Sequence, residues 1–87
     1  MSKSETELLE VYINNPDAMV WSGAAKSVSS ENSTGPFDIL PQHANFVTMI
    51  KNKPIYILTE NKKRNEYIFK SAVISVESNK VLIYSGV

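Results

Sequence analysis

The sequence predicts an all-β protein, folded as an antiparallel β-sandwich. Apolar and polar residues alternate with a period of two over most of the chain, as on strands with one buried face. Turn-forming residues interrupt the alternation at intervals of roughly 8–12 residues, a spacing typical of sandwiches and barrels. A helical period is present only weakly, over Thr6 to Val11. The chain has 87 residues, too few for two independent cores, so residues 1–87 are expected to form one domain.

The first predicted strands lie in the N-terminal third of the chain. Alternation runs from Leu9 to Ile13 and ends at the turn residues Asn14-Asn15-Pro16-Asp17. A second strand covers Met19 to Val28, where Gly23 and the two alanines after it indicate close packing or a β-bulge. The polar segment Ser29 to Thr34 is then expected to be a loop.

The rest of the chain is read as short strands joined by tight turns. Glu60 to Asn65 is a charged hairpin tip, and Glu77 to Lys80 is the turn of a second hairpin. Lysine and arginine at such tips keep exposed strand edges from pairing with other chains. The strands expected here are Phe37–Leu40, Phe46–Ile50, Ile55–Thr59, Tyr67–Phe69, Ser71–Val76 and Val81–Tyr84.

Composition argues against several classes of function. Nine basic and nine acidic side chains give a formal net charge of zero, so no long-range field draws the chain to nucleic acid or to an anionic membrane. There is no cysteine, and therefore neither a disulfide framework nor a thiolate metal site. No apolar run is long enough to span a bilayer, and the N-terminal segment MSKSETELLE lacks the apolar core of a signal peptide. We therefore expect no direct membrane insertion.

His43 is the only histidine and the first candidate for chemistry. A hydrolytic site needs a nucleophile, a base and a group that orients the base, and no motif of that kind surrounds this residue. A small enzyme that uses His43 with Asp38 is one hypothesis. The alternative, which we favour, is a structural ring that hydrogen-bonds the backbone of its own turn. With three glycines and no phosphate-binding loop, no catalytic residue, cofactor or metal site is expected.

Two further groups of side chains have a functional and a structural interpretation. Lys62-Lys63-Arg64, with Tyr67 and Phe69 nearby, could bind and stack nucleic acid, but a solvated tip and two core rings explain the same pattern. We favour the second interpretation and expect no nucleic-acid partner. Aromatic residues elsewhere could anchor a protein interface, although in so small a domain a core position is favoured for each of them: Trp21, Phe37, Phe46 and Tyr84.

The stretch Asp38 to Ile50, DILPQHANFVTMI, is the most informative part of the chain. With Gly35-Pro36-Phe37 before it, this stretch resembles the Gly-Glu-Phe/Leu-Gly-Ile-Leu-Pro-Gly-His-Ala signature of ATP synthase epsilon subunits. Gln42 stands where the signature has its second glycine, so a turn that needs positive φ would have to accommodate glutamine. The resemblance extends over roughly Leu9 to Tyr84, in matching order, through Val20-Trp21-Ser22-Gly23, Phe46-Val47-Thr48, Tyr67-Ile68-Phe69 and Asn79-Lys80-Val81-Leu82-Ile83.

The resemblance implies a fold and a function. The fold would be the epsilon N-terminal β-sandwich, with about ten short strands. The function would be that of a non-catalytic central-stalk domain of a proton-transporting ATP synthase. Such a domain binds the gamma subunit and the membrane rotor ring, and so couples proton flow to ATP synthesis. It would be a peripheral protein, held by its partners at the cytoplasmic face of the membrane or in a matrix-equivalent compartment.

The resemblance also implies where partners bind. The rotor-facing surface would come from the region between Asn32 and His43, and Pro41 and His43 would shape its turn. The partner-facing residues expected there are Asn32, Gly35, Phe37, Gln42 and His43.

Two expectations concern the limits of the resemblance. Family members usually continue into a two-helix domain that regulates ATP hydrolysis, whereas this sequence stops at Val87. The helical hairpin is therefore expected to be absent, and no inhibitory or ATP-sensing role is expected. The alternative function is a stand-alone β-sandwich that binds other proteins and has kept the fold without the synthase role.

Overall fold

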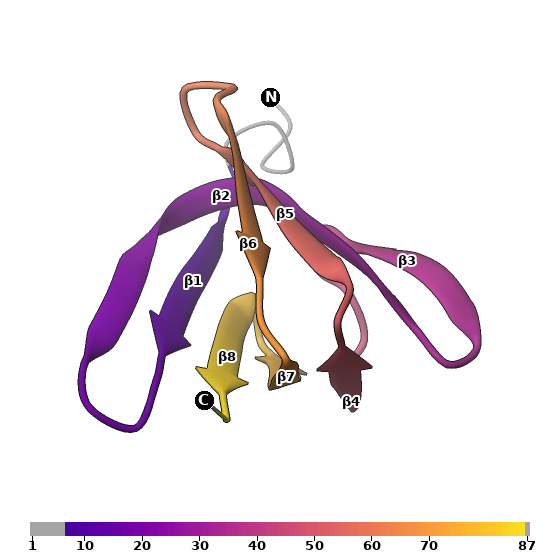
Figure 1. The fold of residues 1–87 in the computed structure, drawn as a ribbon. Coiled ribbons are helices and arrows are strands. Elements are labelled where there is room, and N and C mark those ends of the chain that lie inside the picture. The colour runs from indigo at the N-terminus through magenta and orange to yellow at the C-terminus, as the bar shows by residue number, and fades with distance from the viewer. Residues whose placement is uncertain (1–6, 87) are drawn as a thin grey trace.

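The computed structural model describes residues 7–86, and every regular element in this range is a β-strand (Figure 1). The all-β prediction is therefore confirmed, with eight strands over the described residues where about ten were expected. No helix in this range could cross a membrane. Residues 1–6 and 87 of the predicted domain lie outside the description. The strands are β1 (Leu9–Asn14), β2 (Met19–Asn32), β3 (Gly35–Ile39), β4 (Phe46–Lys51), β5 (Pro54–Thr59), β6 (Arg64–Ile68), β7 (Ser71–Glu77) and β8 (Lys80–Ser85).

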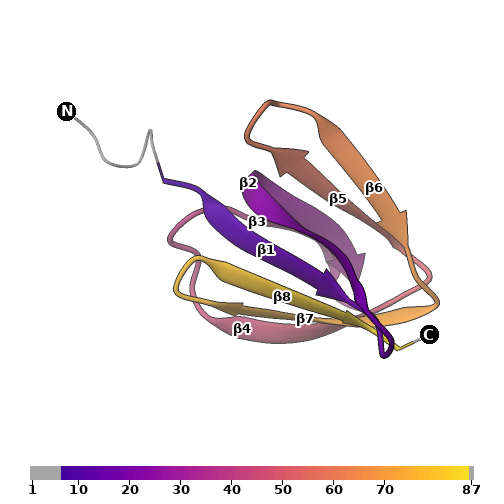
Figure 2. The same ribbon diagram turned by 90° about the vertical axis from the view of Figure 1, so that its left-hand side faces the viewer.

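The eight strands form one curled sheet whose two halves face each other. The strand order is β4-β7-β8-β1-β2-β5-β6, and β3 pairs with β2 beside this path. All pairs are antiparallel except β1 with β8, which run parallel. Figure 2 shows the layer of β4, β7 and β8 on one side and β5 with β6 on the other. The sheet is thus a mixed one that folds into a sandwich.

Strand β2 is long because it takes part in both layers. Its first part pairs with β1, as far as Ala25, and its later residues pair with β5 on one edge and β3 on the other. The register with β5 shifts between Ala25 and Ser27, and such a bulge bends a strand and increases its twist. Close packing at Gly23 is also present, because a Cβ there would lie 2.8 Å from the ring of Trp21. Both features agree with the small residues of this segment.

One prediction about local structure is wrong. Ser29 to Asn32 continue β2, so the expected polar loop shrinks to the two-residue turn Ser33-Thr34. Polar side chains lie in this strand because they have partners: the Ser30 hydroxyl donates to the Pro54 carbonyl at 2.9 Å. The strand expected from Leu9 to Ile13 is confirmed as β1, so the weak helical period does not mark a helix over the described part of that segment.

The core is aliphatic and follows the alternation of the strands. Aromatic rings pack at its margin, including Trp21, Phe37 and Phe46. Tyr84 is instead half exposed, which corrects the expectation that it fills the core. The fully buried apolar residues come from seven of the eight strands: Leu9, Val11, Ile13, Ala25, Val28, Ile39, Ile50, Ile55, Ile57, Ala72, Ile74, Val76, Val81 and Ile83.

Truncation of a core side chain should strongly destabilise the domain. Ile83 is fully buried, and Ile83→Ala should lower the free energy of unfolding by about 2–5 kcal/mol through lost burial and a cavity. The matched surface variant is Val47→Ala in β4, where the side chain is 68 % exposed and the change should stay within about 0.5 kcal/mol. Urea denaturation followed by circular dichroism measures both. Equal effects would show that the described core is wrong.

Candidate functional site

The signature segment forms a tight turn after β3. The His43 N–H donates to the Leu40 carbonyl at 3.0 Å, which closes a four-residue β-turn with Pro41 at its second position. Gln42, at the third position, has φ of 70°. Proline followed by a residue with positive φ defines a type II turn, where glycine is the usual third residue. The expectation that glutamine would have to accommodate positive φ is therefore confirmed.

The ring of His43 is held by the backbone beside it and by an aromatic neighbour. Its Nδ1 lies 2.7 Å from the Ala44 carbonyl, and because a carbonyl only accepts, Nδ1 carries the hydrogen. The ring lies 5.0 Å from that of Phe46, which in turn meets Phe37 edge-to-face at 5.7 Å. His43 thus has the structural contacts that the favoured interpretation required, and it joins an aromatic row that includes Phe37.

Asp38, the proposed catalytic partner of His43, makes a different contact. Its carboxylate accepts a hydrogen bond from the Ser29 hydroxyl across the β2–β3 pair. Among residues 7–86, no hydrogen bond joins Asp38 to His43, and no group of three or more His, Cys, Asp or Glu side chains could hold a metal ion. The arrangement therefore lacks the base–orienter contact on which the enzyme hypothesis depends.

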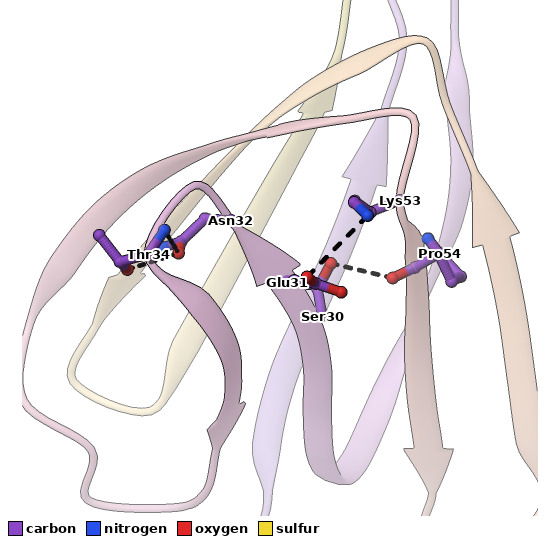
Figure 3. Close-up of polar contacts among 6 residues, drawn as sticks. All are labelled: Ser30, Glu31, Asn32, Thr34, Lys53 and Pro54. Carbon is purple, nitrogen blue, oxygen red and sulfur yellow. Dashed lines mark hydrogen bonds and ion pairs between the residues drawn. The ribbon is translucent and has the colours of Figure 1, made fainter.

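The β2–β3 hairpin carries the remaining predicted residues. Asn32 pairs with Gly35, and its side-chain oxygen accepts from both the N–H and the hydroxyl of Thr34, at 2.9 and 2.7 Å (Figure 3). Its amide nitrogen donates to the Thr48 hydroxyl of β4 at 2.9 Å. Gly35 has φ of 125°, a backbone conformation that residues other than glycine rarely adopt. The hairpin is therefore fixed by Asn32 and Gly35 together.

A weak ion pair lies near the tip of this hairpin. Lys53, in the connection between β4 and β5, approaches Glu31 at 3.9 Å, and both side chains are about half exposed (Figure 3). A solvated pair of this kind contributes little to stability.

The structure does not bring all predicted site residues together. Asn32 and Gly35 lie at the start of β3, whereas Gln42 and His43 follow its end. Gly35 is the first of the five residues of β3, a strand that is roughly 13 Å long at about 3.3 Å per residue. Strand β4 connects them, since Thr48 bonds to Asn32 and Phe46 contacts His43. The candidate surface is thus the side of the sandwich where β3 and β4 lie.

An apolar outer face adjoins this side, and sequence reasoning missed it. Across the ladder, Met49 pairs with Val73, and Val73 pairs with Tyr84, so the three side chains form one row on the outer face of the sheet. In the next row Val47 and Leu82 lie on either side of Ser75, which pairs with both of them. Val47, Met49 and Tyr84 are 68, 55 and 50 % exposed. We call these five residues the apolar face.

The opposite outer face, on the β2–β5–β6 layer, is polar. There Ser29 pairs with Tyr56, which pairs with Glu66, and the Arg64 guanidinium lies 4.1 Å above the Tyr56 ring. Ile68 is a single exposed apolar residue on the edge strand of this layer, at 63 %. Contiguous exposed apolar surface marks binding sites, whereas scattered apolar residues do not. The contrast therefore favours the apolar face as the docking surface.

The basic hairpin tip does not present an aromatic platform. Tyr67 and Phe69 stack on each other with ring centroids 6.2 Å apart and pack against the core. Burial raises the pKa of the Tyr67 hydroxyl above its usual range. Both rings therefore pack against the protein itself, as we expected for core rings in this segment.

Comparison with known proteins identifies a matching family. Residues 8–86 match the family described as the β-sandwich domain of the ATP synthase delta/epsilon chain. The ATP synthase epsilon chain of Clostridium botulinum is 33 % identical over 75 residues, which are 86 % of this chain and 56 % of the relative. That of Sulfurimonas denitrificans is 28 % identical over 83 residues, 95 % of this chain and 60 % of the relative. The chain therefore spans little more than half the length of these relatives.

Solved structures show the same fold at low sequence identity. A chain of the Euglena gracilis mitochondrial ATP synthase superposes with a TM-score of 0.83 at 14 % identity, over 90 % of this chain and 50 % of that one. A chain from the central stalk and c-ring of the Tetrahymena thermophila mitochondrial ATP synthase gives a TM-score of 0.74 at 12 % identity, over 93 and 65 % of the two chains.

Replacement of Gln42 by glycine should stabilise the domain. A side chain at φ of 70° is strained by about 1–2 kcal/mol, part of which is offset by the greater freedom of glycine in the unfolded chain. Gln42→Gly should therefore raise the free energy of unfolding by about 0.5–1 kcal/mol. Ala44→Gly, two residues away and without positive φ, should lower it by a similar amount. Thermal or urea unfolding distinguishes the expected gain in stability of Gln42→Gly from the expected loss in Ala44→Gly. A loss of stability in Gln42→Gly would contradict the turn assignment.

Proposed function

Because the chain belongs to the β-sandwich domain family of ATP synthase delta and epsilon chains, we propose that it is a non-catalytic domain of the central stalk of a proton-transporting ATP synthase. It acts by being held between larger partners, a gamma-type subunit and the membrane rotor ring, and so takes part in coupling proton flow to ATP synthesis. Two separate surfaces, the apolar face and the β3–β4 side, support a domain with two partners.

The apolar face is the surface that fits the gamma-type subunit. Five apolar residues on three adjacent strands, with Ser75 among them, form a patch of the kind that marks a protein interface. Met49 and Tyr84 at its centre are residue types enriched in interfaces. This patch is the single observation that carries the proposal, since among the described residues of β5 and β6 the one exposed large apolar side chain is Ile68.

The β3–β4 side is the surface that fits the rotor ring. The turn at Gln42 and His43 and the hairpin at Asn32 and Gly35 present backbone and polar groups held by specific hydrogen bonds. Preorganised polar loops suit contact with other polar loops, because little conformational entropy is lost on binding. In this arrangement the domain is peripheral, attached through its partners at the cytoplasmic face of the membrane or in a matrix-equivalent compartment.

A charge on the apolar face should strongly weaken binding to a gamma-type subunit. Val47→Glu should raise the Kd by at least about thirtyfold, because the interface would bury an unpaired carboxylate. Ile68→Glu is the matched control, since its side chain is equally exposed but lies on the other layer, and it should change the Kd less than about twofold. Isothermal titration calorimetry on the two folded variants gives both values.

Two outcomes would contradict the proposal. If the unaltered chain does not bind a gamma-type subunit at micromolar concentration, the stalk assignment fails and the stand-alone binding module gains support. If Val47→Glu and Ile68→Glu weaken binding equally, the subunit binds elsewhere on the domain.

A further inference from the structure

Two loops that are far apart in the sequence are joined at one end of the sandwich. The Gln42 N–H of the signature turn donates to the side-chain oxygen of Asn79 at 2.6 Å. In the opposite direction, the Ser78 N–H donates to the side-chain oxygen of Asn45 at 3.3 Å. The turn after β3 and the β7–β8 turn therefore exchange hydrogen bonds through two asparagines, 37 and 33 residues away from their partners.

The backbone of Asn79 is itself held firmly. Ser78 and Asn79 have φ of 51° and 64°, and positive φ at both central residues defines the type I′ turn of a two-residue hairpin. The Asn79 carbonyl also accepts the N–H of Glu10, in β1, at 2.8 Å. Its side chain consequently projects from a rigid point where β1, β7 and β8 meet.

The signature turn needs such a support. Gln42 is strained by its positive φ, and the remaining backbone bond that closes the turn is the one from His43 to Leu40. A residue in a strained conformation persists only where its surroundings hold it. The Asn79 oxygen accepts the N–H of the strained residue itself, and so opposes the local relaxation that the strain favours.

We propose that Asn79 is a positioning residue that fixes the Leu40–His43 turn relative to the centre of the sheet. Through Asn79, a force on the turn reaches β1 and β8 instead of being absorbed by loop movement. The β7–β8 turn thereby becomes part of the same surface as Gln42 and His43. That this surface meets the rotor ring rests on the proposed function, whereas the positioning itself does not.

A simpler explanation of Asn79 is its tolerance of positive φ, which asparagine shares with glycine. The two explanations differ in what glycine would do. Asn79→Gly satisfies the type I′ turn at least as well, but removes the side-chain oxygen. Asn79→Asp keeps an acceptor in the same place and also tolerates positive φ.

Amide-proton exchange in the full 87-residue chain tests the proposal. In Asn79→Gly, exchange at Gln42 should accelerate about tenfold, as expected for the loss of one hydrogen bond. The melting temperature should not fall, and exchange at core residues such as Ile74 should stay unchanged. Asn79→Asp should restore the slow exchange of Gln42. Nuclear magnetic resonance resolves these amides individually.

The outcomes separate the positioning role from the proposed function. Unchanged Gln42 exchange in Asn79→Gly, or exchange as fast in Asn79→Asp as in Asn79→Gly, overturns the positioning role. If Asn79→Gly frees the turn and also weakens binding to isolated rotor rings, both ideas are supported. If the turn is freed but binding to the rings is unaffected, the positioning role stands and rotor contact through this turn is refuted.

Discussion

The structure depends on one constraint, that β2 must pair in both layers at once. Its 14 residues contact β1 early and β5 and β3 late, and the register shift after Ala25 provides the bend between the two parts. Small residues permit this bend, because Gly23 leaves room for the Trp21 ring and Ala25 is fully buried. Without the bend the two halves of the sheet could not face each other over a shared aliphatic core.

Strand β4 contributes to both of the proposed binding surfaces. Side chains that point inward, such as Phe46 and Thr48, support the signature turn and the β2–β3 hairpin. Side chains that point outward, Val47 and Met49, belong to the apolar face. Because strand residues alternate strictly between two sides, a one-residue slip of β4 would exchange these roles. The register of β4 therefore determines both which side chains support the signature turn and the hairpin and which side chains form the apolar face.

Alternation in the sequence was enough to predict the all-β class and the positions of most strands. It could not distinguish Ser29 to Asn32 from a loop, since their partners lie on strands distant in sequence. Nor could it show that Tyr84 and Met49 share a row, because register is a property of pairing. The support of Gln42 by Asn79 spans 37 residues, and only the assembled sheet brings those two residues together. The signature itself did indicate the positive φ of Gln42.

The central claim is that the domain works by being bound through the outer face of the β4–β7–β8 layer. Methyl cross-saturation measures this contact directly at the level of side chains. The chain is deuterated except at its methyl groups, and the protonated gamma-type subunit bound to it is saturated. If the gamma-type subunit binds the apolar face, the methyl groups of Val47, Met49 and Leu82 should lose signal and that of Ile68 should not. Signal loss at Ile68 with Val47 and Met49 unchanged would contradict it.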